Sequence, residues 1–300
     1  MSIDDKRIHL IERAAARLRR PEAPPVVADP SPVAAFERPD SQRVPRLEPE
    51  RRPRVEEKRP ATIDAAALAK AGLIDWDQRG TRIVEELRIA QNNLLRHSFG
   101  DHGTVATRSG NLVMITSALA GEGKSFISLN LAAGVARQAE RRVLLIDTDV
   151  KPHGSLGQMF GLSMAPGLLD LTRAGEFDLE EVIIPTAWEN LAFLPLGSGA
   201  ADPLSRARIA ELVADIGRRY RERLIILDAA PCLSSSDPHT LAPIMGQTVL
   251  VIAASVTQQT DIEAALDLVR TCPVVSLLLN KIRTWSGHSF GSYGHSAAQA

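Results

Sequence analysis

The chain has 300 residues, of which 44% are apolar and 4% aromatic, so aliphatic side chains must fill most of its core. Its 35 Lys and Arg residues nearly balance its 36 Asp and Glu residues, which argues against a generally basic nucleic-acid-binding protein. Two cysteines are too few for a disulfide framework or a four-cysteine zinc site. No apolar run approaches the roughly 18–20 residues that span a bilayer, and no signal peptide is visible. We therefore expect a cytoplasmic protein without a membrane span of its own, and association with the inner face of the membrane through a partner stays open.

Two N-terminal segments are predicted to precede the main domain. In residues 1–20, apolar side chains such as Ile8, Ile11 and Leu18 recur at helical spacing, which predicts a short amphipathic helix. This helix either packs as an ordinary surface helix or docks on a partner or a membrane surface. Residues 21–60 contain ten of the 19 prolines, and their apolar residues are too sparse to repay the entropy of ordering. We expect a disordered linker there.

Helical spacing of apolar residues begins soon after this linker. Residues 62–98 are predicted to be helical, and the stronger half starts at Thr81, a favourable N-cap residue. The side chains expected to face a core from this half are Val84, Leu87, Leu94 and Leu95.

Beyond this region, short apolar runs alternate with helical stretches. The strand candidates are residues 112–116, 143–146, 191–194, 224–227, 249–253 and 274–279, and the helix candidates are 124–138, 205–220 and 259–270. Nearly all-apolar strands that alternate with helices indicate a doubly wound α/β fold with a mostly parallel sheet. Ligands of such sheets bind beyond the carboxyl ends of the strands. We assign residues 61–283 to this domain and residues 284–300 to a flexible tail.

The strongest motif is a strand that runs through Gly121-Glu-Gly-Lys-Ser125 into a helix. This is the context of a phosphate-binding loop, in which glycine backbone N–H groups and the helix N-terminus face a triphosphate. Lys124 would reach the β- and γ-phosphates, and Ser125 would coordinate Mg²⁺. The strict pattern requires glycine at position 118, where this chain has Ala118. The predicted cofactor-binding residues of the loop are Gly121, Glu122, Gly123, Lys124, Ser125 and Phe126.

Two acidic motifs follow apolar strands and are expected at the same edge of the sheet. The run Val143–Ile146 ends in Asp147-Thr-Asp149, and the run Leu224–Leu227 ends in Asp228. Carboxylates there can hold Mg²⁺, directly or through water, or accept the proton of a hydroxyl nucleophile. The alternative is a structural cap or turn. The predicted catalytic residues are Lys124, Asp147, Asp149 and Asp228, and the predicted metal ligands are Ser125, Asp147 and Asp228.

Asn280 ends the last predicted strand. Its amide can pair with the edge of adenine, whereas the alternative is a turn-forming asparagine. The phosphate-binding loop and Asn280 together predict ATP and Mg²⁺ as cofactors.

With these motifs, residues 81–283 resemble the catalytic domains of bacterial tyrosine kinases of exopolysaccharide synthesis, within the deviant P-loop ATPases. The predicted N-terminal helix and linker are similar to those of the exosortase-associated tyrosine autokinase subgroup. The resemblance implies ATP-dependent autophosphorylation on a C-terminal tyrosine cluster, assembly of identical subunits into a ring, and activation by a membrane polysaccharide chain-length regulator. It also implies that Asp147 orients or deprotonates the acceptor tyrosine, and that Asp149 assists the metal or switches conformation.

The chain departs from this family in three places, one of which is the run Val150-Lys-Pro-His153 after Asp149, where the family has a more basic stretch. The tail contains one tyrosine, Tyr293, in place of a cluster. The ring-forming motif Glu-x-x-Arg-x-x-Arg is matched at Glu85 and Arg88, but its last position is Gln91. We therefore keep two alternatives beside a tyrosine autokinase with Tyr293 as acceptor: a nucleotide-driven assembly switch, and a catalytically weak regulator of a membrane polysaccharide co-polymerase.

Overall fold

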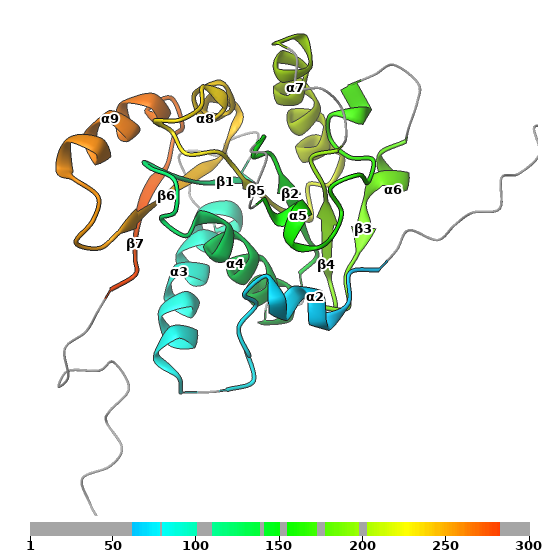
Figure 1. Ribbon diagram of the computed structural model, residues 1–300, viewed down its shortest axis with the longest axis horizontal. Coiled ribbons are helices and arrows are strands. Elements are labelled where there is room, and N and C mark those ends of the chain that lie inside the picture. Colours follow the sequence, from blue (N-terminus) through cyan, green and yellow to red (C-terminus); the bar gives the residue numbers. More distant parts are fainter. Residues whose placement is uncertain are drawn as a thin grey trace, which may run out of the picture. The chain divides into compact units, whose positions relative to one another are not determined.

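Seven strands form one sheet in the order β3-β4-β2-β5-β1-β6-β7 (Figure 1). All neighbouring strands run parallel except β3 and β4, which are antiparallel. The strands are β1 (Leu112–Ser117), β2 (Val143–Asp147), β3 (Ile184–Pro185), β4 (Leu191–Leu194), β5 (Leu224–Asp228), β6 (Gln247–Ala253) and β7 (Val275–Asn280). The predicted α/β class with a mostly parallel sheet is therefore confirmed, and six of the seven strands coincide with predicted runs.

This computed structural model describes residues 62–78, 80–100, 110–138, 141–150, 155–172, 178–197 and 203–282, with no side chains at 138 and 203–207. These residues all lie within one unit, Glu56–Ala300. The predicted N-terminal helix, the linker and the tail with Tyr293 lie outside the described residues. No helix in the described part of the chain has the length and apolar character needed to cross a bilayer.

Helices cover both faces of the sheet. The helices are α2 (Ala65–Lys70), α3 (Arg82–Phe99), α4 (Lys124–Gln138), α5 (Leu156–Met159), α6 (Leu179–Val182), α7 (Pro203–Arg219), α8 (Asp237–Leu241) and α9 (Gln259–Val269), with short 3₁₀ turns at Asp170–Thr172 and Ala242–Ile244. Alternate strand residues supply two separate cores, because successive side chains point to opposite faces. One core includes α2, α3 and α4, and the other includes α7, α8 and α9.

The helical prediction for residues 62–98 is confirmed in α2 and α3 but is wrong for the segment between these two helices. Gly72 has φ 97°, a conformation that favours glycine and ends α2. The intervening segment is then held by α4: Asn130 accepts a hydrogen bond from the Ile74 N–H at 2.9 Å and donates to the Gly72 carbonyl at 3.0 Å. Trp76 packs its ring where Gly134 of α4 has no Cβ, since a Cβ there would lie 2.5 Å from the ring. These tertiary contacts outweigh the local helical spacing.

Thr81 is the N-cap of α3, as predicted, but its side chain does not cap the helix. Its hydroxyl donates to the Gln78 carbonyl instead. Val84, Leu87 and Leu94 are buried and Leu95 is partly buried, so the predicted core face of α3 is confirmed.

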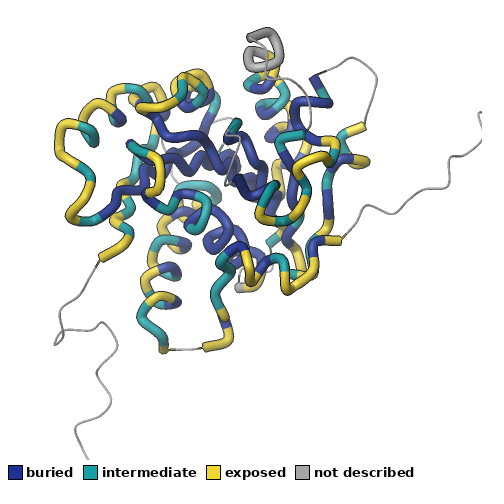
Figure 2. Tube along the Cα trace, viewed as in Figure 1, coloured by how far each residue is buried: buried dark blue, intermediate teal, exposed yellow. Residues whose placement is uncertain are grey.

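Burial is greatest in the strands that carry the predicted motifs. Every residue of β1, β2, β5 and β6 is buried, whereas β7 at the sheet edge is only partly covered (Figure 2). Because β1, β2 and β5 are adjacent and parallel, their carboxyl ends form one rigid edge. This edge carries the phosphate loop, the Asp147 motif and Asp228.

Candidate nucleotide-binding site

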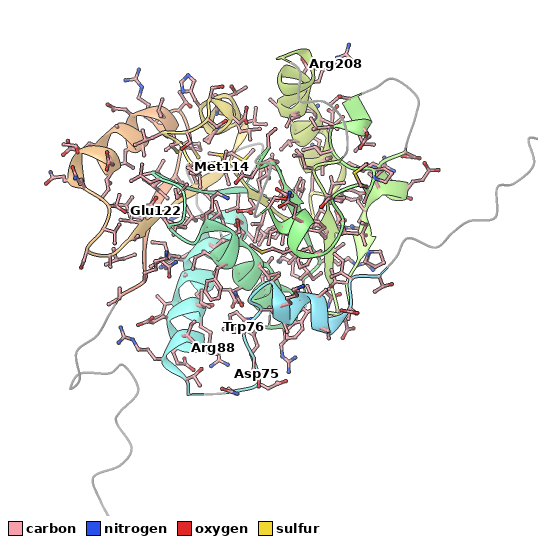
Figure 3. The ribbon with its side chains drawn as sticks, viewed as in Figure 1. Asp75, Trp76, Arg88, Met114, Glu122 and Arg208 are labelled. Carbon is pink, nitrogen blue, oxygen red and sulfur yellow. The ribbon has the colours of Figure 1, made fainter. Side chains whose placement is uncertain are left out.

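The loop between β1 and α4 has the backbone of a phosphate-binding loop. Gly121 and Gly123 have φ of 82° and 97°, and α4 starts directly afterwards at Lys124. Glu122, labelled in Figure 3, lies between them. A Cβ at Gly123 would lie 2.2 Å from the Asn280 amide nitrogen, so a side chain here would displace that amide besides straining the backbone.

Ala118 fits the position where the strict loop pattern has glycine. It is fully buried, and its φ is not in the left-handed region. Its carbonyl accepts a hydrogen bond from the Leu233 N–H at 3.2 Å. An alanine is therefore accommodated without strain, and the sequence departure does not disturb the loop.

The Glu122 side chain points into the protein. It is only 3% exposed, and its Oε2 accepts a hydrogen bond from the Leu119 N–H at 2.7 Å. Its Oε1 accepts from the Ala253 N–H at 3.3 Å and from the Thr257 hydroxyl. The predicted role of this residue in cofactor binding can therefore involve only its backbone, because its carboxylate links the loop to the end of β6.

Lys124 lies among the predicted acidic residues. Its Nζ is 2.6 Å from Asp149 Oδ2 and 3.9 Å from Asp228 Oδ1, and its side chain is 8% exposed. Ser125 is adjacent, with its hydroxyl oxygen 3.2 Å from the same ammonium. The Ser128 hydroxyl, which the sequence motifs did not indicate, donates to Asp228 Oδ1 at 3.1 Å. The three motifs therefore meet around one buried ammonium.

Asp147 lies beside Asp228 at the paired ends of β2 and β5. Its Oδ2 accepts a hydrogen bond from the Gly157 N–H at 2.9 Å, and its Oδ1 accepts from the Asp149 N–H at 3.1 Å. Burial and the negative charge of Asp228 nevertheless raise the pKa of Asp147 to about 7. A carboxyl group with that pKa can exchange a proton near neutral pH.

Two other charged groups of the site, Asp228 and Lys124, also have shifted pKa values. Burial raises the pKa of Asp228, although Lys124 and the nearby Ser125 and Ser128 hydroxyls oppose the rise. For Lys124, burial alone would lower the pKa, but Asp228, Asp149 and Asp147 together raise it. The ammonium therefore stays protonated at neutral pH.

The site suits a divalent cation bound together with phosphate groups. The carboxylates of Asp149 and Asp228 face the Lys124 ammonium, and Asp228 Oδ2 is buried with no hydrogen-bond partner among the described residues. In the part of the chain that the structure describes, no three His, Cys, Asp or Glu side chains are arranged to hold a metal by themselves. Mg²⁺ commonly takes one or two protein ligands and completes its shell with water and substrate phosphates, so Ser125 and Asp228 fit that role.

A cavity of about 610 Å³ lies beside the loop, lined by the first turns of α3, by Phe126 and by the end of β7. Phe126 is partly buried and packs on the core of α3 and α4. Asn280 donates a hydrogen bond to the Glu122 carbonyl at 2.9 Å, so it contacts the phosphate loop directly. The structure thus brings Asn280 and Phe126 next to the loop, while Tyr293 lies outside the described residues.

A pH-dependent stability is expected from the buried Asp147. Its pKa rises from the ordinary value of 3.8 to about 7, so between these values the folded protein keeps a proton that the unfolded chain has released. Raising the pH through this window therefore removes stability. Against Asp147→Asn, which cannot ionise, the wild type should lose up to about 4 kcal/mol of unfolding free energy between pH 4 and pH 8. Chemical denaturation without nucleotide or Mg²⁺ measures this difference, and a difference independent of pH would contradict it.

Comparison with known proteins agrees with this geometry. Over residues 113–285, more than half of the chain, the sequence matches the family described as CobQ/CobB/MinD/ParA nucleotide binding domain. Tyrosine-protein kinase Wzc of Salmonella typhi is 31% identical over 168 residues, which are 55% of this chain and 23% of Wzc. Tyrosine-protein kinase YwqD of Bacillus subtilis is 29% identical over 187 residues, which are 61% of this chain and 77% of YwqD.

A solved structure with the same fold is the VpsO kinase domain. It has 30% sequence identity and a TM-score of 0.51, over 65% of this chain and 98% of that domain. The chain spans only 18–23% of the length of the first curated relatives that it matches. The matched region contains the phosphate loop, Asp147, Asp149, Asp228 and Asn280. The chain therefore belongs to the CobQ/CobB/MinD/ParA nucleotide-binding domain family.

Proposed function

We propose that the chain is an ATP-dependent protein-tyrosine kinase that phosphorylates itself and regulates exopolysaccharide synthesis or export. The observation that carries this proposal is the buried group of Lys124, Asp149, Asp228 and Asp147 behind a glycine loop. The names of relatives that share this region, Wzc, YwqD and VpsO among them, support a kinase over other reactions of the family.

Lys124 is the residue that binds the β- and γ-phosphates in this proposal. In the described structure its ammonium pairs with Asp149 at 2.6 Å, so it must leave that carboxylate to reach a phosphate. Ser125 and Asp228 hold Mg²⁺, which neutralises charge on the phosphates when bound. The Lys124 ammonium and Mg²⁺ would together stabilise the transferring phosphoryl group, because its negative charge is spread over its oxygens.

Asp147 is the residue proposed to orient the acceptor hydroxyl and to take its proton. A pKa of about 7 is close to the optimum for a general base at neutral pH. The N–H groups of Gly157 and Asp149 hold its carboxylate in place. When Lys124 moves to a phosphate, its ion pair with Asp149 breaks, so the interactions of Asp149 change with the nucleotide state.

Asn280 is proposed to contact adenine through its side-chain oxygen. Its amide nitrogen donates to the Glu122 carbonyl, so the oxygen is the atom suited to accept from the exocyclic amine of adenine. The neighbouring cavity of about 610 Å³ is within the usual size range of small-molecule sites.

The proposal includes a membrane polysaccharide chain-length regulator as activating partner and a ring of identical subunits. The residues of α3 that match the ring-forming motif give only partial support for a ring. Glu85 and Arg88 form an ion pair at 2.7 Å and are partly exposed, whereas Gln91, at the third position of the motif, is buried. Only two of the three motif positions can therefore meet a neighbouring subunit.

Tyr293 is the proposed acceptor, because the only other tyrosine is inaccessible. Tyr220 is 7% exposed and lies in the core that includes α7, with Arg223 over its ring. We expect Tyr293→Phe to remove the phosphotyrosine formed with Mg·ATP, while Tyr220→Phe leaves it unchanged. Mass spectrometry of the intact protein and its peptides measures both variants. Phosphotyrosine at an unchanged level in Tyr293→Phe would rule out this acceptor.

A nucleotide-driven assembly switch is the second candidate, and the ion pair between Lys124 and Asp149 favours it. ATP phosphates would compete for Lys124 and so release Asp149, which lies where β2 ends. This candidate predicts nucleotide-dependent assembly without phosphotyrosine. Measuring sedimentation and phosphotyrosine on one Mg·ATP-treated sample separates the two functions, because only the kinase produces the modification.

A further inference from the structure

The end of β7 holds the phosphate loop from its outer side. Asn280 donates a side-chain hydrogen bond to the Glu122 carbonyl at 2.9 Å, and the Lys281 ammonium donates to the Gly121 carbonyl at 2.6 Å. Two consecutive carbonyls of the loop are therefore bound by two consecutive residues that lie about 160 positions later in the chain. Lys281 follows Asn280 directly in the sequence, but the sequence predicted a role for Asn280 alone.

Peptide geometry gives these bonds a consequence for phosphate binding. In a planar trans peptide the C=O and the N–H point in opposite directions. The Gly121 carbonyl shares its peptide unit with the Glu122 N–H, and the Glu122 carbonyl shares its unit with the Gly123 N–H. When β7 holds both carbonyls outward, both N–H groups turn to the opposite side, where a phosphate-binding loop presents its donors.

The backbone of Lys281 is unusual in a way that supports a specific role. Its φ of 59° lies in the left-handed region, which is unfavourable for a residue with a side chain. Such conformations persist where the surrounding structure fixes them, and they concentrate at functional sites. Here the Ala254 N–H donates to the Asn280 carbonyl at 2.8 Å, which anchors the turn to the end of β6. The turn is thus held in place where the Lys281 side chain reaches the loop.

We infer that Lys281 is a positioning residue of the nucleotide site, which acts on phosphate through the loop backbone. Its ammonium holds the Gly121 carbonyl outward and so directs the Glu122 N–H at the phosphates. This inference rests on the proposed nucleotide-dependent function and adds a residue that determines how well the loop is organised. Lys281 itself does not touch phosphate, in contrast to Lys124.

The test is nucleotide binding by Lys281→Met, Lys281→Arg and the matched surface control Lys70→Met, which replaces an exposed lysine in α2. Loss of the charge-assisted hydrogen bond from the exposed Lys281 ammonium should lower the affinity of Lys281→Met for Mg·ADP by about tenfold. Arginine can still donate to the Gly121 carbonyl, so the affinity of Lys281→Arg should stay within about threefold of the wild type.

In steady-state phosphorylation by Lys281→Met, the KM for ATP should rise while kcat is retained, because the ground state and the transition state lose the same contact. Titration calorimetry and initial rates measure these quantities.

A fourth variant, Lys281→Gly, separates the ammonium from the backbone strain. Glycine adopts φ near 59° without cost, so its melting temperature should not fall, yet its affinity for Mg·ADP should fall as in Lys281→Met. Equal affinity of Lys281→Met and wild type, or wild-type affinity in Lys281→Gly, would overturn the role of the ammonium while leaving the proposed function intact. Failure of the wild type to bind Mg·ADP would instead overturn the proposed function, and this inference with it.

Discussion

Replacing Lys124 with methionine is expected to abolish Mg·ATP binding and phosphotyrosine formation. In the described part of the chain, the Lys124 ammonium lies beside the buried carboxylates of Asp149 and Asp228, and a triphosphate would take it as its main protein charge partner. Two charge-assisted hydrogen bonds to phosphate, each of about 1.5–3 kcal/mol, correspond to a loss of at least roughly 100-fold in affinity. Titration calorimetry with Mg·ATP measures the loss, and Lys70→Met serves as the control for removal of an exposed lysine.

The same substitution also changes the stability of the protein without nucleotide. Removing one partner of a buried ion pair typically costs about 3–5 kcal/mol, because the remaining charges stay buried. The double variant Lys124→Met with Asp149→Asn removes one of those charges and should recover part of the stability without recovering nucleotide binding. If a folded Lys124→Met protein bound Mg·ATP like the wild type, the loop between β1 and α4 would not be a phosphate-binding loop.

Replacing Asp147 with asparagine is expected to lower the rate of phosphoryl transfer by about 10²–10⁴-fold while nucleotide affinity is kept. A group that accepts the acceptor proton contributes mainly in the transition state, so its loss appears in kcat and less in binding. Asp147 is suited to this role because burial and Asp228 raise its pKa to about 7. Single-turnover phosphorylation at saturating Mg·ATP measures the rate directly.

The pH dependence gives this prediction a second readout. The carboxylate is the active form of a base, so the wild-type rate should rise with pH up to about 7 and then level off. The small residual rate of Asp147→Asn should lack this rise, whereas Asp267→Asn, a change at an exposed position of α9, should behave as the wild type. Asp147→Ala tests whether the asparagine amide disturbs the Gly157 and Asp149 N–H groups. Wild-type kcat in both Asp147 variants would exclude a role in catalysis.

Local signals in the sequence were sufficient for most of the fold. The strands β1, β2, β5 and β6 are fully buried, so their apolar runs stand out, and each ends in a motif or a turn. The helix α4 follows directly from Gly123-Lys124-Ser125, and it was predicted with its observed ends. Because parallel strands place all their carboxyl ends at one edge, the meeting of Lys124, Asp147 and Asp228 also followed from the sequence.

Segments whose conformation depends on distant residues escaped prediction. The strand β3 has two residues, one of them Pro185, and forms by pairing with β4 and by accepting a hydrogen bond from the Ile63 N–H. The break between α2 and α3 depends on Asn130 and on the packing of Trp76 at Gly134. Neither β3 nor the break between α2 and α3 leaves a periodic pattern in its own segment of the sequence.

The same distinction applies to the site. The sequence by itself determined the residue types at the loop and at the strand ends, because glycine, lysine and aspartate there have a direct relation to phosphate and Mg²⁺. Only the tertiary structure decided that Glu122 faces inward to Thr257, that Lys124 pairs with Asp149, and that Lys281 holds the loop. The reason is physical: two of these contacts join residues more than 130 positions apart, and all three depend on the direction that each side chain takes after the strand ends have met, which no spacing along the chain encodes.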